Sequence, residues 1–219
     1  MNDLGPDPPR FCGISKETSA LGTWVTMRLA GRRANDNGGS ALSTNADQRH
    51  AVTDGRLQEA LRHLHPPPGT KLWHGGATVL GALRGLSPEV AAWKPSPDRH
   101  SIWALSLHVA YWNYAVRRRL TGEERGGFPR SPSDFPAVPD EGTDEGTAEA
   151  WQSDRRLVKE QHDLLVDAVE DFDPDRLDHA SEGPDNRTFS DLIFGIVLHD
   201  TYHAGQIQMM KRLAASHGR

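Results

Sequence analysis

The strongest constraint on the fold is the segment 102-IWALSLHVAYWNYAVRRRLTG-122, which is apolar on nearly every side for about four helical turns. Ser101 precedes it as a natural N-cap, and three arginines followed by Gly122 suit the end of a helix. A surface helix would carry one apolar stripe, whereas a helix that is apolar all round is buried. The segment is therefore predicted to run through the centre of a helical bundle.

Other segments supply the helices that would surround it. Leu57, Leu61 and Leu64 have helical spacing before a proline run, and a weaker helical pattern covers residues 73–86. An apolar stripe covers residues 148–172. Thr188 and Asp191 resemble a capping box that starts a last helix reaching Ala214.

No segment shows the sustained period-two alternation of a strand, and no repeat of 20 to 50 residues is present. The pattern predicts an all-α protein, an up-down four-helix bundle with a long loop at residues 123–147 between its second and third helices. Compact domains seldom carry such long connections without a function, so the loop is expected to be either a lid that shapes a pocket or a segment without fixed structure.

Residues 1–53 are rich in glycine, proline, asparagine and serine and contain little apolar sequence. Such a segment buries too little surface to offset the entropy lost on ordering, so a disordered N-terminal extension is expected there. The bundle domain is expected at residues 54–215. Met27 offers an alternative start, so residues 1–26 need not belong to the native protein.

Composition excludes several classes of partner. The net charge of −5 has both signs interspersed, which argues against a nucleic-acid surface. No run of apolar residues is long enough to span a membrane. The single cysteine, Cys12, forms no internal disulfide and is expected to be inert, as in a cytoplasmic protein in a reducing compartment.

Two histidines, His199 and His203, stand four residues apart inside the apolar run of the last helix. That spacing places both rings on one helix face, so both are expected to point inward. Burying two unpaired imidazoles costs a few kcal/mol, which either a bound metal ion or hydrogen bonds to neighbouring groups would offset. Helix geometry alone does not choose between these two explanations.

His108 is a candidate third ligand, because bundle sites are built from facing helices and His108 lies in the central segment. His100 is a rival, but it lies ~12 Å farther along a continuous helix and cannot reach the same ion. Asp200 is rotated about 100° from His199 and is expected to face elsewhere. The candidates for supporting or pocket-lining roles are Gln206, Tyr202, Trp112 and His74. The histidines expected to be solvated are His50, His63, His65, His162, His179 and His217.

The pair of segments 101-SIWALSLHVAYW-112 and 198-LHDTYHAGQI-207 resembles the DinB-like family, four-helix bundles regarded as metalloenzymes. The resemblance covers residues 57–213. It implies that His108, His199 and His203 bind one divalent ion, often zinc or nickel, with water in the remaining positions. Some members are bacterial S-transferases that use bacillithiol or mycothiol, and related proteins include a mycothiol-dependent maleylpyruvate isomerase.

Three functions follow as hypotheses. The first is a metal-dependent transferase, or a thiol-dependent isomerase, that activates a low-molecular-weight thiol for reaction with a small-molecule substrate. The second is a metal-binding bundle without turnover, induced under stress. The third is a metal-free structural module with hydrogen-bonded histidines. A homodimer formed through two helices is compatible with all three.

Overall fold

The computed structural model describes residues 45–124, 126–139, 146–183 and 185–219. Within these ranges the protein is helical and has no strand, which confirms the all-α prediction; one isolated bridge pairs Ala180 with Thr188. Four helices are long: α1 (Asn45–Leu64), α4 (Ile102–Thr121), α5 (Gly146–Glu170) and α6 (Phe189–Ser216). Three are short: α2 (Val79–Ala82), α3 (Pro88–Ala92) and the 3₁₀ turn η1 (Pro174–Arg176).

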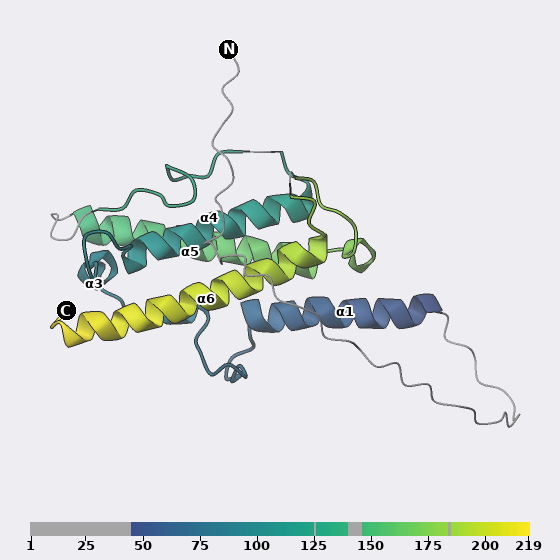
Figure 1. Ribbon diagram of the computed structural model, residues 1–219, viewed down its shortest axis with the longest axis horizontal. Helices are drawn as coiled ribbons and strands as arrows, with labels where there is room; N and C mark the ends of the chain where they lie inside the picture. Colours follow the sequence, from purple (N-terminus) through teal and green to yellow (C-terminus); the bar gives the residue numbers. More distant parts are fainter. Residues whose placement is uncertain (1–44, 125, 140–145, 184) are drawn as a thin grey trace, which may run out of the picture. The chain divides into compact units, whose positions relative to one another are not determined.

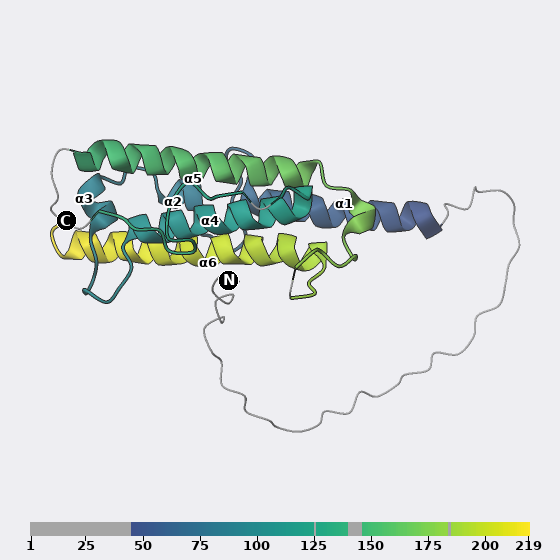
Figure 2. The ribbon, with the colours of Figure 1, turned by 90° about the horizontal axis from the view of Figure 1, so that it is seen from above.

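Helices α4 and α5 run in the same direction, and α6 runs opposite to both (Figures 1 and 2). Trp103 near the start of α4 packs on Trp151 near the start of α5, with ring centroids 5.1 Å apart. Val116 and Leu165, farther along these two helices, share a second apolar cluster. The order therefore differs from the alternating up-down order expected from the sequence. The long connection between α4 and α5 allows this, because its described residues 126–139 return along the bundle toward the start of α4 (Figure 1).

The core consists of two apolar clusters separated by a polar layer. One cluster centres on Trp103, Trp151 and Ile207, and the other contains Leu165 and Ile193. Between them along α4 and α6 lie buried polar residues, namely His108, Asn113, Asp200 and His203. Buried polar groups must find partners, so this layer is where a functional site is expected.

The predicted caps of the two site-bearing helices are confirmed, although α6 continues to Ser216, two residues beyond the predicted end at Ala214. The Ser101 hydroxyl accepts a hydrogen bond from the Ala104 amide at the start of α4, and Gly122 closes that helix with φ +72°. At the start of α6, Thr188 and Asp191 form both bonds of a capping box. These caps fix where each helix starts, and with it the position of every histidine along the axis.

The structure differs from the sequence prediction near the N-terminal side of the domain. Residues 73–86 are helical only at α2, and α3 was not predicted; Gly75 and Gly85 both have positive φ, which interrupts a helix. The predicted domain boundary at residue 54 falls inside α1. Residues 1–44, including Cys12 and Met27, lie outside the described residues, so the predicted disordered extension stays a prediction there.

Candidate metal centre

Three histidines meet in the polar layer. His108 comes from the middle of α4, and His199 and His203 come from successive turns of α6. Their ring centroids lie 4.4 to 5.1 Å apart, and one ligand nitrogen from each lies within 4.8 Å of the other two. The Nε2 atoms of His108 and His199 are 3.2 Å apart. In the described part of the chain, this is the one cluster of three or more groups that has metal-ligand spacing.

Each of the three rings has an oxygen atom beside its Nδ1. For His108 this is the backbone carbonyl of Asp134 at 2.9 Å, and for His203 it is the Gln206 side-chain oxygen at 2.6 Å. His199 Nδ1 lies 3.4 Å from Oδ1 of Asp200. These oxygens are acceptors, so each favours the tautomer in which Nδ1 carries the hydrogen.

That tautomer leaves the Nε2 lone pairs directed at one another. Two lone pairs at 3.2 Å repel unless a proton or a cation lies between them. Two nitrogens bound tetrahedrally to one zinc ion are about 3.3 Å apart, given Zn–N bonds of about 2.0 to 2.1 Å. The residues present therefore fit a divalent ion.

The described part of the α4–α5 connection packs over His108, which the sequence did not reveal. Asp134 adopts φ +74°, and its carboxylate accepts a hydrogen bond of 2.9 Å from Trp112 Nε1. Phe135 is stacked between the rings of His108 and His100, with centroids at 4.1 and 3.9 Å. This segment forms one wall of the centre, with His100 on its outer side. Its only sequence signal is a cluster of turn residues, SPSDFP, which does not indicate where the turn packs.

The residues predicted to support the site fall into two groups. Gln206 bonds to His203 through its oxygen, and its Nε2 donates to the Tyr202 hydroxyl at 3.0 Å. Trp112 lies against the centre, with its ring 6.2 Å from that of His199. His74 is elsewhere: it stacks on His63 at 6.0 Å and makes no ring contact with the three histidines.

The position of Asp200 differs in one respect from the expectation that it faces away from His199. Its side chain leaves α6 in another direction than that of His199, as predicted, but the carboxylate still reaches the His199 ring. With its amide nitrogen facing Asp200, Asn113 donates to both carboxylate oxygens at 3.2 and 3.3 Å. Burial raises the pKa of Asp200, and the neighbouring His199 opposes that rise. A buried carboxylate thus supports a histidine of the centre from behind.

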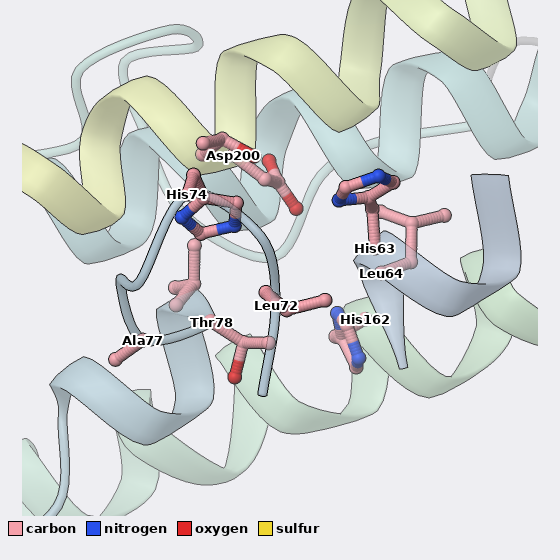
Figure 3. A pocket seen from close by; sticks show the side chains of 10 residues that line it. His63, Leu64, Leu72, His74, Ala77, Thr78, His162 and Asp200 are labelled. Atoms are coloured by element: carbon pink, nitrogen blue, oxygen red, sulfur yellow. The ribbon is translucent and has the colours of Figure 1, made fainter. Parts of the chain in front are cut away.

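The same carboxylate lines a small pocket on the side of His74 (Figure 3). Its volume of about 10 Å³ is close to the minimum for a single water molecule. His162 also lines it, although the sequence prediction placed this residue in solvent. His162 is buried, its Nδ1 has no hydrogen-bond partner, and burial lowers its pKa. The sequence prediction for His162 was therefore wrong.

The metal-free protein is expected to lose stability as the pH falls. Burial, followed by the charges of His199 and His108, lowers the pKa of His203 to about 3. The unfolded chain has a histidine pKa of about 6.5, so between these values it binds a proton that the folded protein does not. The free energy of unfolding should be fully retained above pH 6.5 and fall below it, by about 1.4 kcal/mol per pH unit for each such histidine.

Urea denaturation of metal-free protein between pH 7.5 and 4.5 measures this slope. His203→Gln removes the titrating ring and keeps a polar side chain, so its slope should be shallower than that of the wild type. An identical slope in the two proteins would show that the low pKa of His203 contributes nothing to acid sensitivity.

Comparison with known proteins agrees with this geometry. The sequence profile of the DinB superfamily matches residues 72–207, more than half of the chain and a range that contains all three histidines. No curated protein and no solved structure matches the chain. Every helix in the described ranges is too short or too polar to cross a lipid bilayer. With a helical fold, a three-histidine cluster and this profile match, the chain belongs to the DinB superfamily.

Proposed function

We propose that the protein binds one divalent metal ion through Nε2 of His108, His199 and His203. One observation carries the proposal: two Nε2 atoms face each other at 3.2 Å while the Nδ1 atoms of the same rings already face oxygen acceptors. Hydrogen bonds among the histidines would not remove that repulsion, because the acceptors favour hydrogens on Nδ1. A cation would remove it.

Zinc and nickel are the proposed metals, since neutral imidazoles suit these ions better than magnesium or calcium. The cluster contains three histidines and, among the described residues, no carboxylate or thiol as a fourth ligand. Three protein ligands leave a coordination position open, as in catalytic zinc sites. A bound divalent ion supplies Lewis acidity, which lowers the pKa of a thiol or water that it coordinates.

The proposed activity is the transfer of a low-molecular-weight thiol to an electrophilic small molecule. The family resemblance motivates the thiol, and a reducing cytoplasm would keep it in the reactive form. The chain itself provides the walls of the site: Phe135 and Trp112 offer apolar contact, and Asp134 holds both His108 and Trp112 in place. The open ligand position favours this activity over a metal-storing bundle without turnover.

Reconstitution tests the activity directly. Purified protein loaded with zinc or nickel is incubated with a panel of thiols and electrophiles, including bacillithiol and mycothiol, and conjugates are measured by mass spectrometry. We expect conjugation with metal-loaded protein and none with metal-free protein. Stoichiometric metal without conjugation across the panel would favour the non-catalytic metal-binding function.

Gln206 provides a test of the metal site that does not require the substrate. Gln206→Leu keeps the side-chain size but removes the oxygen that orients the His203 ring. Losing such a supporting group typically weakens metal binding by about 10- to 100-fold. Competition with a chelating dye measures that loss. Gln208→Leu, the same change two residues along α6, should bind metal as the wild type does, and equal affinity of both variants would argue against a role for Gln206.

A further inference from the structure

One face of α6 carries an exposed stripe that no described segment covers. Its members recur at alternating spacings of four and three residues, and all are exposed: Asp191, Gly195, Leu198, Tyr202, Gly205, Met209 and Arg212. Leu198, Tyr202 and Met209 keep 69%, 63% and 65% of their surface in solvent. Seen from above, α6 runs along one edge of the bundle (Figure 2).

The spacing of the stripe is that of a helix that pairs with another helix. Alternating steps of four and three average 3.5 residues, the repeat of the contact seam in two-stranded coiled coils. The charged residues stand at its two ends, and the positions from 195 to 209 are glycine or large apolar and aromatic residues. Contiguous exposed apolar surface rimmed by charge is typical of an interface rather than of a solvated helix face.

We propose that this stripe is the interface of a homodimer in which α6 of one copy packs antiparallel against α6 of a second copy. The charges at the two ends of the stripe favour a second copy as the partner and an antiparallel direction of pairing. Asp191 stands at one end of the stripe and Arg212 at the other. An antiparallel pairing brings the acidic end of each copy beside the basic end of the other, whereas a parallel pairing places like charges together. The same surface on both copies is then self-complementary, as a two-fold interface requires.

The sizes of the residues fit the same arrangement. Two glycines, Gly195 and Gly205, stand among the large residues of the stripe, and a Cβ built on either glycine meets no neighbouring segment within 4 Å. These positions are open hollows on the surface of α6. With the two-fold axis near Tyr202, at the middle of the stripe, Met209 of each copy faces Gly195 of the other and Leu198 lies beside Gly205, while the two Tyr202 rings meet at the axis. Helix backbones approach closely where small residues lie at the contact.

The interface would also reach the histidine cluster. The Tyr202 hydroxyl accepts a hydrogen bond from Gln206, whose oxygen bonds to Nδ1 of His203. Pairing would remove this chain of hydrogen bonds from solvent and restrict the exposed Tyr202 ring. Dimer formation itself does not depend on metal binding, so the two proposals can fail separately.

Sedimentation equilibrium of the full chain tests the pairing. A protein of 24.2 kDa is expected to show twice that mass at micromolar concentration. Met209→Asp places a charge within the apolar part of the interface, and the dissociation constant of the dimer should rise by at least about 30-fold, the effect of losing one hot-spot residue. Trp73→Asp is the control, because it also replaces a large, exposed apolar side chain by a charge but lies off the stripe; this variant should remain dimeric.

Gly205→Leu distinguishes a broken interface from a damaged fold. The new side chain meets open space in its own chain and improves helix propensity, so the monomer should melt at the same or a higher temperature. In the dimer it fills a hollow, so the mass should fall to that of the monomer. A wild-type protein that is monomeric at every concentration, or a Gly205→Leu variant that stays dimeric, would overturn the proposal.

Cysteine crosslinking tests the direction of pairing in a Cys12→Ser background. Tyr202→Cys lies near the two-fold axis and should form a disulfide with its own counterpart under mild oxidation. Met209→Cys lies about 10 Å farther along each helix, so in an antiparallel pair the two thiols are too far apart to join. Efficient crosslinking of Met209→Cys would indicate a parallel pair and contradict the antiparallel interface.

Discussion

His203→Ala is expected to abolish stoichiometric binding of zinc or nickel by the purified protein. The variant removes one of three converging nitrogens and leaves the cluster with two ligands, the Nε2 atoms of His108 and His199. Losing a supporting group outside the coordination shell already costs about 10- to 100-fold in metal affinity, so losing a ligand should cost more than about 100-fold. The buried position also limits rescue by other side chains, because His203 lies inside the bundle.

Elemental analysis after gentle purification measures the metal content, with one equivalent expected for the wild type and a small fraction for His203→Ala. His65→Ala is the control. His65 is exposed and contacts the His162 ring rather than the three-histidine cluster, so its loss should leave the metal content unchanged. Equal metal in both variants would contradict the assignment of His203 as a ligand, and metal-free wild type would contradict the centre as a whole.

Sequence periodicity identified the parts of this centre that are local to one helix. His199 and His203 share a face because residues four apart do, and Gln206 follows His203 by three residues, a spacing that also keeps two side chains on one face. Meeting His108 depends on the relative position of α4 and α6, which helical periodicity alone does not specify; the family resemblance supplied it. Asp200 was misjudged because a 100° rotation describes where Cβ lies, whereas the carboxylate extends back toward the neighbouring ring.

The positions of Asp134 and Phe135 beside His108 could not be predicted from helical periodicity. They lie in a connection without regular structure, and their contacts with His108 depend on a positive φ at Asp134 and on how the chain turns there. His162 was misjudged for a different reason. Its immediate neighbours, Gln161 and Asp163, are polar, but it has helical spacing with Val158 and Leu165, both of which are buried. The helical spacing of His162 with these apolar residues indicated burial, but its polar neighbours in the sequence suggested a solvent-exposed position.

For the fold, too, the sequence predicted features within one helix better than the direction of one helix relative to another. Caps at Ser101 and Thr188 were predictable because a cap involves residues three apart. The relative direction of α4 and α5 was not, because a connection of this length permits α5 to begin at either end of the bundle. Packing between Trp103 and Trp151 identifies the parallel arrangement of the two helices, and this contact is expected to contribute strongly to the stability of the fold.

Trp103→Ala is expected to lower the free energy of unfolding by about 3 to 5 kcal/mol, the usual cost of truncating a buried tryptophan. Trp103 has no exposed surface, packs against Trp151 with the two ring planes tilted by 55°, and donates a hydrogen bond of 2.8 Å to Asp154. Urea denaturation measures the loss. Trp103→Phe keeps most of the apolar volume and removes only the donor, so it separates the packing contribution from the hydrogen bond, which is worth about 1.5 to 3 kcal/mol when the acceptor is charged.

Trp73→Ala removes the same atoms at a position that is 99% exposed, and it should change the free energy of unfolding by no more than about 0.5 kcal/mol. The contrast isolates burial as the cause, because the chemical change is identical. Trp103 lies in α4 five residues before His108, about one and a half turns away, so the variant should also loosen the centre and lower its metal affinity. If Trp103→Ala costs no more stability than Trp73→Ala, the contact between α4 and α5 does not hold α4 in place, and the position of His108 must depend on its contacts with α6 and Asp134 instead.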